Sequence, residues 1–275
     1  MTASTAVRLA GADALALLHR ISTNAVADLA RGQACATLFC DFRGRMLYRA
    51  VVGVTGDGAV WLLRDDAPGE PLAAFLDRHV FRDDVRIEDR SSELTVRYTP
   101  DSTGLAPGTV SERDGIPLAV RCAGAEALLV GGPHAESEHG AAEAERIRAG
   151  RPAHGHEIVE AFTPFEVGLA HEVHLDKGCF TGQEALMRIV TYRSVRRRLA
   201  RVTGTGPAPD VPRDLRADGQ PAGVLTTAVA QGDGWIGLAV VTNEVCESAR
   251  ALMLPDGRAT APPEPFPPTR PQGRP

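Results

Sequence analysis

The chain has 275 residues, which is enough to bury a sizeable hydrophobic core in one large domain or in two or three small ones. Hydrophobic residues make up 43% of the chain and charged residues 24%, the composition of an ordinary soluble globular protein. The formal net charge of −5 argues against a general nucleic-acid-binding protein, although it leaves room for a local basic patch.

Cysteine usage and the absence of targeting signals indicate the compartment. The five cysteines are scattered and include no CxxC pair, so a disulfide framework is not expected and a reducing cytoplasm fits best. The N-terminus lacks the charged start and long apolar core of a signal peptide. No apolar run reaches the roughly 18 residues that span a bilayer. We therefore expect a soluble cytoplasmic protein without membrane contact.

The first 150 residues predict alternating helices and strands. Residues 11–30 carry apolar residues at helical spacing and predict two short helices, broken near residues 22–24 where Ser, Thr and Asn favour caps. Two apolar strands flank residues 41–45, where Gly44 suits a tight turn, and predict a β-hairpin. Further strands are expected at VWLLRDD, ELTVRYT, LAVRCAG and ALLVGG, and helices at APGEPLAAFLDRHVF and HAESEHGAAEAERIRAG. This alternation predicts an α+β body with mostly antiparallel sheet.

The pattern changes after residue 200. Short strands separated by turns predict a small all-β barrel or sandwich, with strands at LARVTG, PAGVLTTAVA, WIGLAVV and ARALMLP. The last 14 residues contain seven prolines and predict a disordered tail. The expected organisation is a body over residues 1–200, a β-barrel over residues 201–258 and a tail over residues 259–275.

The segment DKGCFTGQE, residues 176–184, has an unusual composition for a surface loop. Thr181 followed three residues later by Glu184 fits a capping box, and the helix-forming ALMRIV comes directly afterwards. The pattern therefore predicts a helix that starts at Thr181.

Cys179 would then lie two residues before the helix cap, near the positive end of the helix dipole. Lys177 adds a cation, and both effects favour the thiolate, which is the reactive form of cysteine. Gly178 and Gly182 would let the backbone approach a ligand closely, and an anionic group suits the start of a helix. The competing interpretation is a helix entry with a buried, inert cysteine.

Six arginines and no acidic residue lie between Glu184 and Asp210: Arg188, Arg193, Arg196, Arg197, Arg198 and Arg201. Such an excess suits phosphate, an RNA backbone or a polycarboxylate tail, and a solvated charged face is the alternative. The histidine pairs at 154/156 and 171/174 match neither HExxH nor a complete tetrahedral set, so no metal site is predicted. The motifs GxGxxG, Walker A and GxSxG are absent from the sequence.

KGCFTGQE, from Lys177 to Glu184, resembles the signature of the YgfZ family, K-G-C-aromatic-x-G-Q-E. That family belongs to the folate-binding superfamily of the glycine-cleavage T-protein, an aminomethyltransferase. Looser similarity covers the opening helices and first hairpin, the segment RIRAGRPAHGHEIVEAFTPFE and the closing strands, from about residue 9 to residue 255. The resemblance implies an α+β, T-protein-like folate-binding fold with a ferredoxin-like subdomain and a C-terminal β-barrel.

The resemblance also implies a cofactor, tetrahydrofolate or a one-carbon derivative of it, and the residues around it. Cys179 and Lys177 become the catalytic candidates, facing a folate pocket in a central channel. Glu166 matches the glutamate of the superfamily's L-E-A-G-L segment and would hold the pterin, because a carboxylate can accept paired N–H bonds from an aminopterin edge. The other implied cofactor-binding residues are Gly178, Gly182, Gln183, Glu184 and Arg188, with arginines 188–198 attracting a polyglutamate tail or a partner.

One departure from the superfamily bears on catalysis. The T-protein has an aspartate pair after its hairpin glycine, and one aspartate is catalytic, whereas Tyr48 and Arg49 stand at the matching positions here. A phenol and a guanidinium cannot take over that carboxylate's role of polarising the reacting amine, so glycine cleavage is not expected.

The resemblance instead implies a tetrahydrofolate-binding protein in iron–sulfur cluster assembly or repair and in tRNA modification. Its partners would be iron–sulfur proteins or tRNA-modifying enzymes, with direct nucleic-acid binding left open. One alternative is a folate-dependent one-carbon (methylene or aminomethyl) transferase that acts on a small molecule. Another is a scaffold that no longer binds folate.

Overall fold

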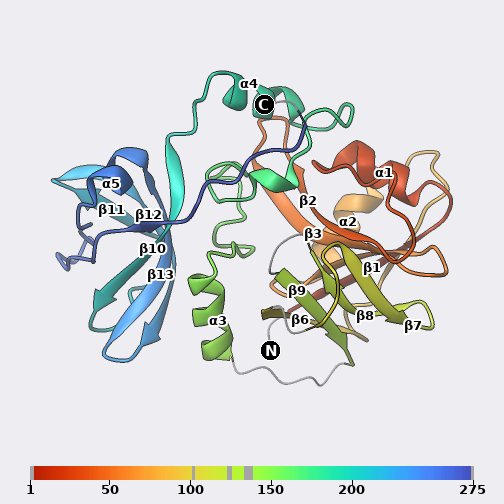
Figure 1. The fold of residues 1–275 in the computed structure, drawn as a ribbon, viewed down its shortest axis with the longest axis horizontal. Coiled ribbons are helices and arrows are strands. Elements are labelled where there is room, and N and C mark those ends of the chain that lie inside the picture. Colours follow the sequence, from red (N-terminus) through yellow and green to blue (C-terminus); the bar gives the residue numbers. More distant parts are fainter. Residues whose placement is uncertain (1–2, 101–102, 123–125, 133–138, 274–275) are drawn as a thin grey trace.

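The structure of the chain is a computed structural model, and it describes residues 3–100, 103–122, 126–132 and 139–273. Within these residues the chain forms three antiparallel sheets with short helices around them. Figure 1 shows the N-terminal sheets on one side, the C-terminal sheet on the other, and a helical segment between them. The α+β architecture predicted from the sequence is confirmed.

The first sheet has the strand order β2-β3-β4-β1-β5, and every neighbouring pair is antiparallel. Helix α1 follows β1 and helix α2 follows β4. The order β5-β1-β4-β3 with these two crossovers is the ferredoxin-like arrangement, to which β2 adds an edge strand. The bounds are β1 Thr5–Ala10, α1 Ala14–Ile21, β2 Ala34–Cys40, β3 Met46–Val54, β4 Val60–Arg64, α2 Glu70–Asp77 and β5 Arg86–Asp89.

Alternation along the strands divides the core into two layers. Leu9 and Leu62 pack with α1 and α2 on one face of the first sheet, whereas Ala6 and Trp61 face the second sheet. Successive strand residues point to opposite faces, which is why neighbouring positions enter different layers.

Only the first of the two helices expected in residues 11–30 forms. It is α1, and residues 25–30 lie in turns and irregular backbone. Thr23 Oγ1 accepts a hydrogen bond from Leu38 N at 3.1 Å, and Asn24 Nδ2 donates to Ala36 O at 2.8 Å. These bonds hold the chain along β2 and stop a second helix from starting.

The second sheet has the order β6-β9-β8-β7. Its strands are β6 Thr95–Pro100, β7 Thr109–Arg113, β8 Ile116–Arg121 and β9 Glu126–Gly131. The predicted polar helix appears as α3 His139–Arg148, and its expected start at residues 134–138 lies outside the described residues. In the part of the chain that the structure describes, no helix is long and apolar enough to cross a membrane.

The C-terminal unit is a sheet with the order β11-β12-β13-β10-β14. Its elements are β10 Arg197–Thr205, β11 Arg213–Ala217, β12 Gln220–Gln231, β13 Gly234–Thr242, α5 Asn243–Ser248 and β14 Glu264–Pro265. Isolated bridges pair Arg216 with Met253, Met253 with Ala259, and Thr260 with Gly204 of β10. Backbone pairing therefore continues from β11 through Met253 and Ala259 to Thr260 beside β10. The closed barrel predicted for this unit stays a prediction.

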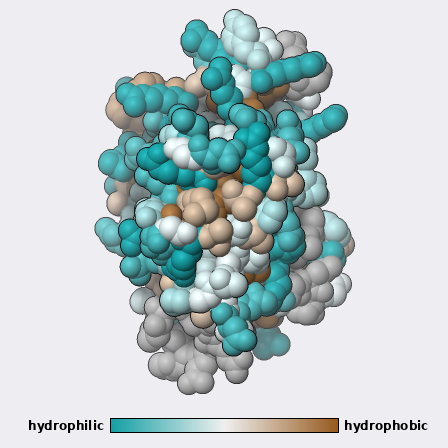
Figure 2. Space-filling view, turned by 90° about the vertical axis from the view of Figure 1, so that its left-hand side faces the viewer, coloured by the Kyte–Doolittle hydropathy of each residue, from teal (hydrophilic) through white to brown (hydrophobic). Residues whose placement is uncertain are grey.

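The surface of this unit is mixed in polarity. Figure 2, which faces the C-terminal side of the molecule, shows an apolar area surrounded by hydrophilic side chains. Met253 is 39% exposed and is the one exposed large hydrophobic residue among those described in the unit. Isolated exposure of this kind is ordinary for a soluble protein.

The segment predicted to be a disordered tail has a defined path through residue 273. β14 pairs with β10, and Phe266 N donates to Leu199 O at 3.1 Å. Further on, Gln272 N donates to Val173 O at 2.8 Å, so the chain end returns to the body beside α4 (Figure 1). The structure differs from the prediction because the residues between the prolines still carry N–H groups and a ring that bind the body.

A core of apolar side chains joins the units. It combines strand residues such as Leu38 and Leu238 with Ile147 of α3 and Leu186 of α4 Gln183–Thr191. The C-terminal unit has its own interior as well, which includes Trp235. The body and the C-terminal unit are therefore fixed to each other by shared apolar burial.

Candidate functional site

The segment of residues 176–182 connects the short 3₁₀ helix η1 Ala170–Glu172 to α4 and packs against α1. His19 Nε2 donates to Lys177 O at 2.8 Å, while His19 Nδ1 accepts N–H bonds from Val26 and Ala27, both at 3.2 Å. The Lys177 ammonium donates in return to His19 O. These reciprocal bonds hold the segment in place from α1.

Lys177 is partly withdrawn from water. Its ammonium lies 5.1 Å from the centre of the Phe180 ring, a cation–π distance. Burial lowers the pKa of Lys177 to about 8. The ammonium is bound by the His19 carbonyl and the Phe180 ring.

The start of α4 differs from the prediction. The N-cap is Gly182, with φ of 85°, and no side chain caps the helix, so the capping box of Thr181 and Glu184 is wrong. A Cβ at Gly182 would lie 2.4 Å from Asp41 O, so the hairpin backbone occupies the space of a side chain. Contact with the hairpin, which only glycine allows, decides where the helix begins.

The remaining signature side chains bind locally. Gln183 Nε2 donates to Leu175 O at 3.0 Å, and Glu184 pairs with Arg188 at 2.5 Å on the exposed face of α4. Gly178 has φ of 107° and open space where a side chain would stand. Their roles at a folate site stay predictions.

Cys179 is exposed, which excludes the buried-cysteine interpretation. It makes no hydrogen bond or ion pair within the described residues. All five cysteines are free, and burial raises the pKa of the Cys35 thiol to about 12 and that of Cys40 further. Cys179 is therefore the thiol best placed to meet a partner molecule from solution.

Glu166 is bound by its own chain. Arg197 Nε donates to it at 2.8 Å, Arg45 pairs with it at 3.6 Å, and Thr163 N donates to it at 2.9 Å. The Glu166 side chain is 12% exposed. A pterin edge would have to replace one of these donors, so the structure does not present Glu166 as a free acceptor.

A cavity of about 570 Å³ lies beside Glu166, between residues 155–162 and the C-terminal sheet. The Arg197 guanidinium, which Glu166 orients, lines the cavity and lies 5.3 Å from the centre of the Phe162 ring. A second guanidinium lining the cavity is that of Arg213 in β11. The other lining residues are Gly155, His156, Val159, Ala161, Phe162, Val211, Pro212, Asp214, Val224, Thr226 and Pro255.

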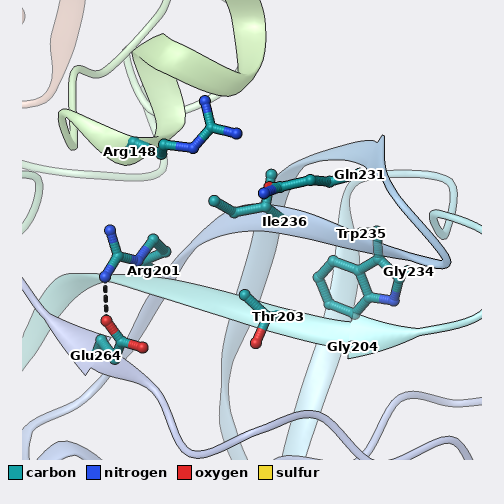
Figure 3. Close-up of a pocket in the computed structure, with 9 residues that line it drawn as sticks. All are labelled: Arg148, Arg201, Thr203, Gly204, Gln231, Gly234, Trp235, Ile236 and Glu264. Atoms are coloured by element: carbon teal, nitrogen blue, oxygen red, sulfur yellow. Dashed lines mark hydrogen bonds and ion pairs between the residues drawn. The ribbon is translucent and has the colours of Figure 1, made fainter.

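A second cavity, of about 410 Å³, lies where α3 approaches β10 and β13 (Figure 3). Arg148 and Arg201 lie at its rim, and Ile236 contributes apolar surface. Two arginines of the basic run line these cavities, Arg197 the larger one and Arg201 the smaller one. Neither Glu166 nor any of the site residues predicted between Lys177 and Arg188 lines either cavity. Neither cavity therefore brings Cys179 together with Glu166, the residue predicted to hold the pterin.

A buried charge cluster lies at the position of the missing aspartates. Arg49 donates to Glu172 at 2.9 Å and to Glu126 at 2.5 Å, and Arg151 donates to Glu126 at 2.8 Å and to Asp65 at 2.5 Å. Burial would raise the pKa of Glu126, but Arg49 and Arg151 outweigh it and hold that pKa far below its ordinary range. Sequence reasoning named Arg49 but missed its carboxylate partners. A signal for them is Glu126, which directly precedes the apolar strand ALLVGG.

The basic run is largely paired within the chain. Besides Arg188 and Arg197, Arg198 donates to Asn243 Oδ1 at 2.8 Å and Arg201 pairs with Glu264. The alternative of a charged structural face is therefore favoured for these positions. Arg193 and Arg196 are exposed.

The histidines have separate surroundings. His154 stacks on Tyr48 with 5.9 Å between ring centres, and His156 Nδ1 lies 2.9 Å from Thr226 O. Among the described residues no group of three or more His, Cys, Asp or Glu side chains is placed to hold a metal ion.

The chain has the fold of an aminomethyltransferase. No protein-family model matches it. The structure of glycine cleavage system aminomethyltransferase T from Bartonella henselae superposes with a TM-score of 0.76 and covers 96% of this chain and 83% of that chain at 16% identity. The T-protein-like fold expected from the sequence is thus confirmed.

Sequence similarity points the same way over shorter segments. The chain is 31% identical over 111 residues to a chloroplastic protein of Arabidopsis thaliana named as a transferase, covering 40% of this chain and 26% of that protein. It is 37% identical over 93 residues to the aminomethyltransferase of Caldanaerobacter subterraneus subsp. tengcongensis, covering 32% of this chain and 24% of the relative. Both matches span about a quarter of the relative's length. The match to the Rubrobacter xylanophilus aminomethyltransferase is longer, with 28% identity over 228 residues, 70% of this chain and 61% of the relative.

Proposed function

We propose that the protein binds tetrahydrofolate and acts, like members of the YgfZ family, in iron–sulfur cluster assembly or repair and in tRNA modification. The aminomethyltransferase fold and the KGCFTGQE segment support the assignment to this superfamily. The observation that carries folate binding is the cavity of about 570 Å³ beside Glu166, a size typical of pockets for small organic ligands.

The residues of this cavity fit the chemistry of a folate. Arg197, paired with Glu166, and Arg213, paired with the exposed Asp210, line the cavity. Their remaining N–H groups can bind the carboxylates of the glutamate moiety, since a guanidinium has five donors. Phe162, Pro212 and Val224 supply apolar surface for flat rings. When bound, tetrahydrofolate supplies a carrier for a one-carbon unit.

Glu166 then acts through Arg197. Its carboxylate fixes the guanidinium at the cavity wall, so that little side-chain entropy is lost when a ligand carboxylate binds. This role differs from the direct pterin contact predicted from the sequence.

The signature segment supplies the functional thiol. Cys179 lies on an exposed loop held by His19 and Lys177, where a large partner can approach it. We assign Cys179 the role of contacting an iron–sulfur protein or a tRNA-modifying enzyme. Lys177 then serves to position the loop.

The alternative of a folate-dependent one-carbon transferase receives support from the names of the sequence relatives. A carboxylate able to accept a proton near neutral pH is what such chemistry would require. Glu126 and Glu172 are instead bound by Arg49, and the pKa of Glu126 is far below neutrality. Neither glutamate is therefore placed to take up a proton, and folate binding is the function that we propose first, with transfer as the alternative.

Calorimetry with tetrahydrofolate tests the proposed cavity. We expect Arg197→Ala to weaken binding at least tenfold, because the guanidinium contacts the ligand carboxylate. Arg86→Ala is the matched control, since Arg86 is an exposed arginine of β5 remote from the cavity lining. Equal affinity of the wild type and Arg197→Ala would exclude this cavity as the folate site.

A further inference from the structure

The second cavity is separate from the proposed folate cavity. It is bounded by α3, β10, the turn between β12 and β13, and β14, and the two cavities have no lining residue in common. Its nine lining residues are Arg148, Arg201, Thr203, Gly204, Gln231, Gly234, Trp235, Ile236 and Glu264 (Figure 3).

Strand pairing builds the floor of this cavity. Thr203 lies opposite Ile236, and Gly204 lies opposite Trp235. A Cβ at Gly204 would lie 2.6 Å from the Trp235 ring, so the indole covers the glycine and fills the interior of the unit on that side. On the other side of the sheet Ile236 packs in the core that joins the units, and the 4% of it that is exposed contributes the apolar part of the cavity lining.

The rim of the cavity is rich in hydrogen-bond donors that the chain does not use. Within the described residues the side chains of Arg148, Gln231 and Thr203 have no hydrogen-bond or ion-pair partner. Arg201 pairs with Glu264. Figure 3 shows Arg148 reaching from α3 towards the side of the sheet that carries Arg201. Two guanidinium groups therefore face one space from two different elements.

The charge balance indicates the class of ligand. Arg148 and Arg201 contribute two positive charges and Glu264 one negative charge, so the rim has one positive charge in excess at neutral pH. A planar carboxylate matches a guanidinium in charge and geometry, and the acidic Glu264 disfavours a dianion. The apolar Ile236 suits a flat or aliphatic body attached to that carboxylate.

We propose that this cavity is a binding site for a small organic monocarboxylate. Arg148 binds the carboxylate, and Gln231 and Thr203 donate to its free oxygen positions. Ile236 packs against the apolar body, and Arg201 remains with Glu264. This site does not depend on the proposed folate cavity, since the two use different residues.

Benzoate is the probe, titrated into the whole chain at constant ionic strength and followed by ¹H–¹⁵N NMR. The chain has two tryptophans. Trp235 is one of the lining residues, and its indole packs on Gly204 in the floor of the cavity. The Trp61 indole donates to Gly115 O at 3.1 Å in the body and serves as an internal control. We expect the Trp235 signal to shift and saturate at millimolar benzoate while the Trp61 signal stays in place.

Four comparisons, three with variants and one with a neutral ligand, decide the proposal. Arg148→Ala and, independently, Gln231→Ala should raise the dissociation constant, the former at least tenfold; both side chains are exposed, so neither change disturbs the core. Arg250→Ala, which removes an exposed arginine paired with Asp218 elsewhere in the unit, should leave the constant unchanged. Neutral benzamide should bind at least tenfold more weakly than benzoate.

The proposal is overturned by an unmoved Trp235 signal, by equal affinity for benzamide, or by wild-type affinity in Arg148→Ala. Displacement of benzoate by tetrahydrofolate would also overturn it, because the cavity would then belong to the folate site. A failure of folate to bind elsewhere leaves the benzoate result unaffected, so the two proposals can fail separately.

Discussion

Replacing Glu126 by Gln removes the central charge of the buried cluster while preserving the shape of the side chain. Glu126 accepts hydrogen bonds from Arg49 at 2.5 and 2.9 Å and from Arg151 at 2.8 Å. Leaving a buried charge unpaired costs about 3–5 kcal/mol. In Glu126→Gln, however, Arg49 keeps Glu172 and Arg151 keeps Asp65, so neither guanidinium is left alone.

The charge count reduces the cost further. With Arg49 and Arg151 against Glu126, Glu172 and Asp65, the cluster carries one negative charge in excess when all groups are ionised. Burial and the carboxylates of Asp66 and Glu126 raise the pKa of Asp65, so removal of Glu126 relieves one repulsion. We therefore expect Glu126→Gln to lower the free energy of unfolding by about 2 kcal/mol.

Arg49→Met is the comparison. It leaves Glu172, which is 1% exposed, without its bidentate partner, so we expect a loss of about 3–5 kcal/mol. Urea unfolding followed by circular dichroism measures both variants. The reasoning is refuted if Glu126→Gln destabilises the protein as much as Arg49→Met, or if both variants match the wild type.

Three further predictions concern the signature segment and the chain end. Cys179→Ser should abolish the activity of an iron–sulfur-cluster-dependent enzyme in cells that rely on this protein, while leaving the melting temperature unchanged. The variant should also lack the thiol that reacts fastest when the native protein is labelled. Retained enzyme activity would contradict a functional role of the thiol. Burial lowers the pKa of Lys177 from 10.5 to about 8. Between about pH 8 and pH 10.5 the unfolded chain therefore keeps a proton on Lys177 that the native protein has lost. The free energy of unfolding should consequently rise with pH over this range. Lys177→Met should abolish that rise, and an identical pH dependence in the variant would refute the assignment. Phe266→Ala should lower the free energy of unfolding by about 2 kcal/mol, since the half-buried ring packs on the shared core. An unchanged free energy of unfolding would indicate that the chain end is not packed on the body.

Local chemistry made the first hairpin and the strands of the C-terminal unit predictable. Gly44 stands in the turn with φ of 73°, as expected for a glycine at a tight turn, and the alternating residues of β12 and β13 form neighbouring strands. These features depend on residues that are close in the sequence, so the pattern alone contains the information.

Distant contacts explain what the sequence could not predict. The start of α4 depends on the contact of Gly182 with Asp41 O. The Glu166 carboxylate is held by ion pairs with Arg45 and Arg197. The path of the chain end depends on Gln272, which binds backbone groups near η1. Each of these contacts joins segments far apart in the chain, where spacing rules give no guidance.

Titration calorimetry of the wild-type chain with tetrahydrofolate tests the central claim most directly. Two guanidinium groups and an apolar wall around a cavity of about 570 Å³ should give a saturable one-to-one isotherm with a dissociation constant of about 1–100 μM. Arg197→Ala should weaken it at least tenfold. A folded wild-type protein that releases no binding heat, and does not compete for folate in equilibrium dialysis, would contradict the account.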